Sequence, residues 1–343
     1  MLKARSLAGL AISALLLVLF LRSVDVWAMV ASITGVNPLF LLPGVAIYFV
    51  GVWLRAARWN RLLAPVAAVP VARLFCVIII GFAVNNLLPF RLGELVRTFL
   101  LRNSNSVPIA ASLASILLER VLDVVVLCGL MVAVSLLAPL SGWPAALASF
   151  SWLVVGCAAA GLAVLLLAPR TLLRWALDQA VRLAERLSAR LGRLVGSFLG
   201  GIRAVETPRS MLLVGGVSIA CWTAELGLYY FVMLAFGFNS GPLSLIAGMV
   251  AANLATVVPS SPGYVGTFDL PLQSVLADTF GVATATASSY TLVAHALLLL
   301  PVVLLGLVLL GREDLSLRAL GQGRVELRSA ARPRAPSTQA LPD

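Results

Sequence analysis

Residues 85–97 read NNLLPFRLGELVR and interrupt an apolar segment with two asparagines, a proline, a glycine and three charged residues. A second interruption, at residues 259–269, reads PSSPGYVGTFD and lies in the other half of the chain. Polar backbone broken by proline and glycine is tolerated at membrane depth only where it packs inside protein or lines a wet cavity. Two such segments in two halves of one chain predict a transport site.

The composition places both segments in a membrane protein. The chain has 343 residues, of which 61% are hydrophobic and 11% charged, whereas soluble domains are about 45–50% apolar and about 25% charged. The net charge is +11, and Lys3 is the only lysine. Because the arginines lie in short loops beside apolar spans and in the tail, they indicate cytoplasmic loops. We therefore expect no nucleic-acid partner.

The cysteines and the single histidine do not form a metal or redox motif. All four cysteines lie in apolar stretches without C-x-x-C spacing, which is typical of small buried hydrophobic residues. His295 stands alone in an apolar run, where it is either a hydrogen-bonded helix residue or part of a polar pathway. The sequence predicts no metal and no cofactor.

Apolar segments long enough to cross a membrane predict six full spans. They are residues 7–22, 39–55, 111–138, 150–168, 211–236 and 285–310. The first of these segments follows Lys3 and Arg5 and could also be a signal peptide. We expect a retained span, because the positions of the basic loops along the rest of the chain are then consistent with a cytoplasmic N-terminus.

The basic residues set the predicted orientation, with the N- and C-termini in the cytoplasm. Arg55, Arg58 and Arg61 mark the cytoplasmic end of the second span. The sides assigned to all loops are then consistent only under two conditions. Residues 73–102 must begin and end on the cytoplasmic side, and residues 243–280 must begin and end on the outer side. Each segment is either a re-entrant hairpin or a pair of full spans.

Paired full spans would leave Arg97 deep in lipid, which is costly, so we expect re-entrant hairpins. The second half then starts on the opposite side of the membrane from the first. Both hairpins also share a spacing, since Gly81 precedes Asn86 by five residues and Gly248 precedes Asn253 by five. The predicted fold is an all-α polytopic membrane protein with about six full spans, two re-entrant helical hairpins and an inverted repeat.

The predicted transmembrane domain covers residues 1–310. Its halves are residues 1–138 and 150–310. Residues 170–205 alternate leucines with arginines at helical spacing and predict an amphipathic helix on anionic lipid at the cytoplasmic face. Residues 311–343 are rich in Arg, Pro, Ser and Ala and predict a disordered basic tail.

The first interruption is the candidate substrate site. Asn86 can bind a head group, or it can satisfy the backbone groups freed by Pro89. Glu94 lies three residues from both Arg91 and Arg97, so all three share a helical face. A salt bridge alone would explain them, but two arginines around one glutamate leave a net positive charge that suits a phosphate.

The segment Glu119-Arg120-Val121-Leu122-Asp123 adds three ionisable groups within an apolar span. Such groups are costly in a membrane and mark function or a partner for it. Glu119, Arg120 and Asp123 could neutralise the hairpin arginines, bind substrate, or do both. We expect an ion-pair network that positions those arginines.

The second half contributes fewer charges. Glu225 lies in an apolar span without a cation nearby in sequence, so it is a candidate for proton coupling together with Asp269. The second hairpin is either a structural turn or a gate. Its candidate gate residues are Asn253, Pro259, Ser260, Ser261, Pro262, Gly263, Gly266 and Asp269.

Three patterns together identify a resemblance. The patterns P-x-R-x-G-E-x-x-R, E-R-x-x-D and P-x-x-P-G-x-x-G resemble those of the lysylphosphatidylglycerol synthase transmembrane-region family, which is flippase-like, over residues 1 to about 310. Similar domains move aminoacylated phosphatidylglycerol across the bacterial inner membrane, and stand-alone relatives are linked to hopanoids and polyprenyl-linked sugars. The resemblance implies a stand-alone membrane domain without the aminoacyltransferase part.

The expected function is therefore a lipid flippase or transporter of the bacterial inner membrane, moving an anionic or modified lipid. We expect no enzyme activity. The alternative is an integral-membrane transferase or an accessory subunit that acts on a lipid-linked substrate. A partner enzyme and a homodimer are both candidate assemblies.

Overall fold

The computed structural model describes residue 27 and residues 33–88, 92–167, 170–189, 191–192, 195–196, 208–257 and 262–312. The predicted span at residues 7–22 lies outside the described residues, as does the predicted tail from residue 313. Within the described part the chain forms helices and no strand, which confirms the predicted all-α fold. The helices are η1 (Pro38–Phe40), α3 (Leu41–Leu63), α4 (Val71–Leu87), α5 (Gly93–Asn105), α6 (Ile109–Leu137), α7 (Gly142–Leu167), α8 (Arg170–Leu187), α10 (Pro208–Ala235), α11 (Pro242–Ala255), η3 (Pro262–Tyr264), α12 (Asp269–Ser274), the π-helical turn η4 (Val275–Thr279) and α13 (Thr284–Arg312).

Five of the described helices are long and apolar enough to cross a membrane. They are Pro38–Leu63, Ile109–Leu137, Gly142–Val164, Arg209–Ala235 and Thr284–Arg312. Each corresponds to a predicted span. Large apolar side chains are exposed on these helices, among them Leu117, Trp152 and Leu304, as expected for faces that contact lipid.

The second span differs from its prediction at one end. The sequence placed Arg55 and Arg58 at the cytoplasmic end of a span closing at residue 55, but α3 continues to Leu63 and buries both arginines. The predicted end of the span at residue 55 was wrong because both guanidinium groups are neutralised inside the protein, while the cytoplasmic side of this end stays a prediction. Arg55 pairs with a carboxylate of α10, and Arg58 with carboxylates of α6.

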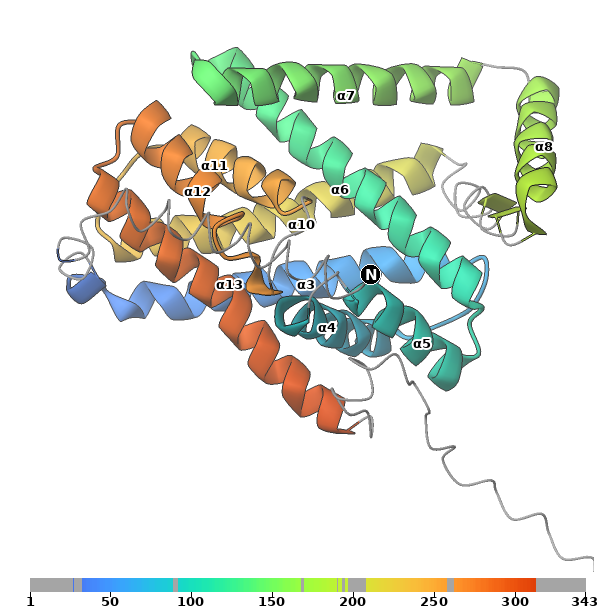
Figure 1. Cartoon of the computed structure of the whole chain (residues 1–343), viewed down its shortest axis with the longest axis horizontal. Coiled ribbons are helices and arrows are strands. Elements are labelled where there is room, and N and C mark those ends of the chain that lie inside the picture. The colour runs from blue at the N-terminus through green and yellow to red at the C-terminus, as the bar shows by residue number, and fades with distance from the viewer. Residues whose placement is uncertain are drawn as a thin grey trace, which may run out of the picture.

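The centre of the bundle is the contact between α3 and α10 (Figure 1). A Cβ atom built at Gly44 would lie 3.1 Å from Cβ of Phe231, and one built at Gly51 would lie 3.1 Å from Cβ of Ala224. Early residues of α3 therefore face late residues of α10, so the two helices are antiparallel. Small residues at the crossing let the backbones approach closely, which stabilises helix association in membranes.

Two pairs of short helices pack beside this centre. Helix α4 packs against α5 and α13, while α11 packs against α12 and α6. In each pair a glycine makes room for the second arm: Gly81 lies against the side chain of Arg97, and Gly248 lies against that of Leu272. Helix α7 packs on α6, and α8 lies at the edge of the molecule (Figure 1).

Residues 93–137 and 268–312 match one another in a constant register, without insertion or deletion. In this register α6 and α13 begin together, and each has 29 residues. The left-handed residues that precede them, Ser106 with φ 55° and Gly281 with φ 70°, also coincide. Their N–H groups donate to the carbonyl oxygens of Arg102 and Ala277, which occupy matching positions as well. This register relates α5 and α6 to α12, η4 and α13, while the predicted inverted repeat stays a prediction.

A methyl group at Gly93 tests the close packing of the first hairpin. Its Cβ would overlap the carbonyl oxygen of Gly81 and the side chain of Asn85. We expect Gly93→Ala to destabilise the fold by about 1–3 kcal/mol, because a packed core cannot absorb the atom without a backbone shift. The measurement is the thermal unfolding midpoint in detergent.

Gly129→Ala is the matched control for this variant. Gly129 lies on α6 with nothing within 4 Å of an added Cβ, so this substitution should keep or raise the midpoint. Equal midpoints for the two variants would show that α4 and α5 do not pack as closely as described.

Candidate functional site

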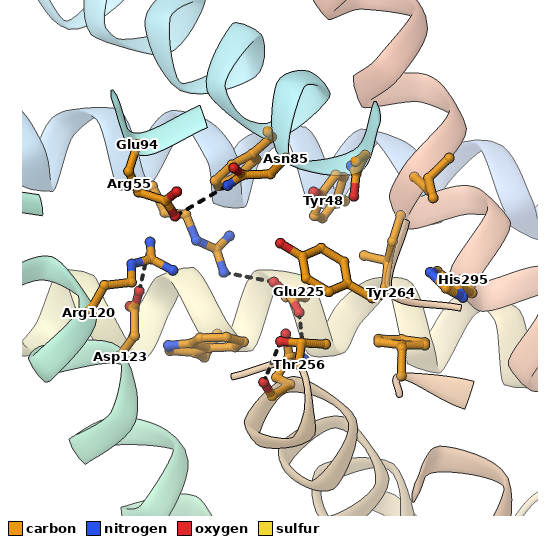
Figure 2. A pocket seen from close by; sticks show the side chains of 17 residues that line it. Tyr48, Arg55, Asn85, Glu94, Arg120, Asp123, Glu225, Thr256, Tyr264 and His295 are labelled. Carbon is orange, nitrogen blue, oxygen red and sulfur yellow. Dashed lines mark hydrogen bonds and ion pairs between the residues drawn. The ribbon is translucent and has the colours of Figure 1, made fainter. Parts of the chain in front are cut away.

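A polar cavity lies between the two halves, in the middle of the bundle (Figure 2). It encloses about 890 Å³ of empty space, part of which is open to the outside. Its wall comes from α3, α4, α5 and α6 of the first half and from α10, α11, η3, α13 and the start of α12 in the second. Polar lining residues are Arg55, Asn85, Asn86, Glu94, Arg120, Asp123, Glu225, Asn253, Thr256 and His295. Aromatic and aliphatic lining residues are Tyr48, Phe82, Trp222, Tyr264, Phe268, Leu298 and Leu299.

One wall is built on the ion pair between Arg55 and Glu225. Arg55 Nη2 donates to Glu225 Oε2 at 2.7 Å, and the two residues are 4% and 6% exposed. Asn253 Nδ2 donates to the second carboxylate oxygen at 3.1 Å, while the guanidinium lies 5.0 Å from the ring centroid of Trp222. The sequence offered Glu225 no nearby cation, but the antiparallel packing of α3 and α10 supplies one from 170 residues away.

The opposite wall rests on a network around Glu119 and Asp123 of α6. Glu119 contacts Arg97 at 2.9 Å, Arg120 at 2.8 Å and Arg58 at 3.6 Å. Asp123 contacts Arg58 at 2.8 Å and Arg120 at 3.2 Å. Three arginines thus share two buried carboxylates, so removing either carboxylate would leave a buried charge unpaired.

Arg97 lies inside this network and not in the cavity wall. It is 2% exposed, and its guanidinium lies 4.0 Å from the ring centroid of Trp59. The structure thus differs from the prediction that Arg97 holds the head group, because Glu119 already neutralises it. Arg91, the other predicted head-group arginine, lies outside the described residues. Arg55 and Arg120 are the arginines among the described residues of the wall.

Asn85 holds the two arms of the first hairpin together. Its side-chain oxygen accepts the N–H of Gly93 at 2.7 Å, and its side-chain nitrogen donates to Glu94 Oε1 at 3.2 Å. Asn86 and Glu94 both line the cavity, beside Asn85. One asparagine side chain thereby supplies hydrogen bonds where the helix is interrupted.

In the second hairpin, the described turn begins at Pro262. Gly263 has φ 73°, a conformation that glycine adopts without strain. Gly266 donates its N–H to Asp269 Oδ2 at 2.8 Å, and Asp269 Oδ1 lies 2.8 Å from His295 Nδ1. Asn253 and His295 line the cavity, whereas Pro259, Ser260 and Ser261 lie outside the described residues.

Described residues beside the turns of the two hairpins meet at the cavity. A side chain at Gly263 would approach the carbonyl oxygen of Asn86 to 3.8 Å, and η3 packs against α4. The structure therefore brings together predicted residues from both motifs, including Asn86, Glu94 and Asn253. A side chain introduced at Gly263 would therefore contact Asn86 of the first hairpin.

Sequence reasoning missed the contribution of α3. The signal was present, because Val52, Ala56, Trp59 and Leu63 continue the apolar face beyond residue 55 at helical spacing. On that reading Arg55 and Arg58 are buried helix residues that require carboxylate partners. Tyr48 lies on the same helix and also faces the cavity (Figure 2).

The network predicts a large cost for neutralising its central carboxylate. We expect Glu119→Gln to destabilise the protein by about 3–5 kcal/mol, because Arg97 would lose its carboxylate partner and Arg58 and Arg120 would keep only Asp123. Thermal unfolding in detergent measures the loss.

Asp178→Asn removes an exposed carboxylate from α8 and serves as the control, with an expected change within about 0.5 kcal/mol. A Glu119→Gln protein as stable as this control would refute the network as a source of stability.

Comparison with known proteins gives the family. Residues 6–306 match the family described as the lysylphosphatidylglycerol synthase TM region. The chain is 24% identical over 326 residues to the glycosyltransferase AglD of Haloferax volcanii, covering 84% of this chain and 51% of AglD. It is 25% identical over 273 residues to a UPF0104 membrane protein of Methanothermobacter thermautotrophicus, covering 75% of this chain and 80% of that protein. The UPF0104 membrane protein MJ1078 of Methanocaldococcus jannaschii is 25% identical over 194 residues, covering 56% of this chain and 78% of that protein.

The chain spans about half the length of AglD. No solved structure matches it. The family match extends over nearly the whole described bundle, from the region before α3 into α13. The chain is therefore an integral membrane protein that belongs to the lysylphosphatidylglycerol synthase TM-region family.

Proposed function

We propose that this protein moves a lipid between the leaflets of the membrane, holding the polar head group in the cavity while the acyl chains stay in the bilayer. The observation that carries the proposal is a buried polar cavity between two halves of an apolar bundle. Polar cavities between repeats are where transporters bind their substrates.

The cavity wall keeps unused hydrogen-bonding capacity. Within the described part of the chain, Arg55 Nη1, Trp222 Nε1 and Glu94 Oε2 are buried and have no hydrogen-bond partner. A buried polar atom without a partner costs about 1–3 kcal/mol. A bound head group would supply the missing partners, so these atoms support ligand binding.

The signs of the charges refine the expected head group. Among the described lining residues, Arg55 and Arg120 face Glu94, Asp123 and Glu225, so donors and acceptors are both present. A purely anionic group would meet carboxylates, and a purely cationic group would meet guanidinium groups. The cavity therefore suits a head group that carries both acceptor oxygens and hydroxyl or ammonium donors.

The two hairpins supply the candidate gates. Their tips meet beside the cavity, where Gly263 lies next to Asn86. If the hairpins enter from opposite faces, separating one tip at a time opens the cavity to one leaflet at a time. Asn253 and Glu94 line the space that such a motion would expose.

The lipid surroundings follow from the same proposal. Helix α8 exposes Arg182 and Arg186 together with Trp175, Leu183 and Leu187, a combination that suits anionic lipid at the cytoplasmic face. We place the protein in the bacterial inner membrane with both termini in the cytoplasm. A homodimer and a partner enzyme are the assemblies we would test first.

Trp222→Phe tests the head-group site with little change to the fold, because the indole N–H makes no hydrogen bond within the described residues. We expect lipid movement to fall about five- to tenfold, the loss of one hydrogen bond to substrate. The measurement uses proteoliposomes with acyl-chain fluorescent phosphatidylglycerol, phosphatidylethanolamine and glucosyl diacylglycerol, and an impermeant quencher that reports the outer leaflet.

Ser112→Ala provides the matched control. The hydroxyl of Ser112 on α6 is buried and, like Trp222 Nε1, has no hydrogen-bond partner among the described residues, but it lies outside the cavity wall. Its removal should leave lipid movement unchanged. Movement of none of the three lipids by the wild-type protein would count against the lipid substrates named here, and equal effects of the two variants would count against the cavity as the site.

A transferase is the second candidate, because the relative AglD is named a glycosyltransferase. The chain spans about half of AglD, so that name does not decide which part of AglD carries the activity. Incubation of the purified protein with a polyprenyl phosphate and a nucleotide sugar would favour a transferase if a glycosylated lipid forms.

A further inference from the structure

The pair formed by Asp269 and His295 occupies the same place in the second half as Glu94 and Arg120 in the first. In the register that aligns the start of α6 with the start of α13, Glu94 corresponds to Asp269 and Arg120 corresponds to His295. Both acids begin the second arm of a hairpin, and both bases hold the same position within a 29-residue helix. The two halves therefore hold an acid and a basic residue at equivalent positions, and Glu94, Arg120 and His295 of these four line one cavity.

The second pair is in direct contact and is shielded from solvent. Asp269 Oδ1 lies 2.8 Å from His295 Nδ1, and the side chains are 8% and 12% exposed. The histidine ring also packs against Phe268, with ring centroids 4.5 Å apart. His295 lines the cavity, so water or substrate can reach the pair from that side.

The two bases differ in their neighbours. Beside Arg120, the acids Glu119 and Asp123 provide permanent partners. The corresponding residues beside His295 are Ala294 and Leu298, which carry no charge. Within the described part of the chain, Asp269 is thus the acid in contact with His295.

Other titratable and charged groups near His295 come from the elements packed around it. Helix α4 contributes the neutral side chains Asn85 and Asn86, and η3 contributes the phenol of Tyr264. Across the cavity, α10 presents Glu225 and α3 presents Arg55, which neutralise each other. The remaining groups are Tyr48 of α3, Tyr229 of α10, Glu94, Arg120 and Asp123 across the cavity, and Asp278 of η4, which accepts a hydrogen bond from Ser274.

The chemistry of the two bases gives the halves different behaviour. Arginine keeps its charge at any physiological pH, so the first half holds a permanent cation at this position. Histidine is the side chain whose ordinary ionisation falls between pH 5 and 8. The second pair can therefore exist as an ion pair or as a neutral hydrogen bond, depending on one proton.

We propose that Asp269 and His295 form the proton-binding site of the transport cycle. When they bind a proton, the resulting ion pair holds the second hairpin against α13. With the proton bound, the ion pair holds α12 against α13. Without it, the weaker contact lets the hairpin move. This inference rests on the proposed lipid transport and adds its proton dependence.

A hydrogen bond connects the turn of the second hairpin to this pair. The second carboxylate oxygen of Asp269 accepts the N–H of Gly266, which lies in the hairpin turn with φ 80°. The same turn brings Gly263 against Asn86 of the first hairpin. A change at Asp269 therefore acts on the contact that closes the cavity.

Glu225 is less suited to this role, although it was the other candidate for proton coupling. Arg55 contacts it at 2.7 Å, and Asn253 donates to its second oxygen. Protonation of Glu225 would leave the buried guanidinium of Arg55 without its counter-ion, which is costly. The proton is therefore assigned to the second hairpin.

The chain has one histidine, so selective isotope labelling observes His295 alone. We would record the ¹⁵N imidazole signals of the full-length protein, purified without a histidine tag, between pH 5 and 9. We expect one titrating histidine in the wild type and a displaced titration in Asp269→Asn. A histidine that stays in one protonation state over this range would overturn the proposal.

Transport is measured over the same pH range in proteoliposomes containing acyl-chain fluorescent phosphatidylglycerol and phosphatidylethanolamine. We expect wild-type movement to rise several-fold from pH 5.5 to 8, because loss of the bound proton weakens the contact that holds the hairpin. His295→Arg copies the first half and should be slow at every pH. His295→Gln keeps a hydrogen-bond donor without the titration and should be independent of pH.

The outcomes separate the two proposals. If His295→Gln keeps the wild-type pH profile, the proton site is refuted while lipid transport stands. If wild-type protein moves neither lipid at any pH although His295 titrates together with Asp269, these two lipids are refuted as substrates while Asp269 and His295 still form a proton-binding pair. Thermal unfolding of each variant shows whether a slow rate reflects lost protein.

Discussion

The need to neutralise charge inside an apolar bundle organises this protein. Arg58 is fully buried and contacts Glu119 and Asp123 of α6 as well as Ser218 of α10. Each of these helices would be costly in lipid alone with its charge uncompensated. Together they satisfy one another, so the ion pairs determine which helices must be neighbours. Asp123, a partner of Arg58, also lines the cavity, and fold and site therefore share residues.

A second constraint acts on the interrupted helices. A break in a membrane helix frees backbone groups that lipid cannot satisfy. In the first hairpin Asn85 bonds to Gly93 and Glu94, and in the second Asp269 bonds to Gly266. In both cases a polar side chain accepts a backbone N–H at a glycine, but Asn85 joins the two arms of its hairpin, whereas Asp269 bonds within the turn that precedes α12. The polar residues that mark the hairpins in the sequence are thus partly structural.

Hydropathy and charge placement were sufficient to predict the helical membrane fold and five spans, because each helix is decided by its own local sequence. The partners of individual charged residues were harder to predict from the sequence. Arg55 was placed at the cytoplasmic end of the second span because its partner, Glu225, is 170 residues away. Arg97 was assigned to substrate, although Glu119 and Trp59 enclose it. Such partners depend on how helices cross, which composition and periodicity do not specify.

The hairpins differ in length, and this has a kinetic meaning. Gly81 and Glu94 mark the two arms of the first hairpin, and Gly248 and Asp269 mark the corresponding positions of the second. The chain between the second pair of positions is the longer one, so the arms of the second hairpin have a longer connection. If the hairpins are the gates of the proposed lipid transport, unequal connections allow them to open at unequal rates, yet unequal rates alone would leave the distribution of lipid at equilibrium unchanged. Under that proposal, net accumulation in one leaflet would require a source of free energy outside the hairpins.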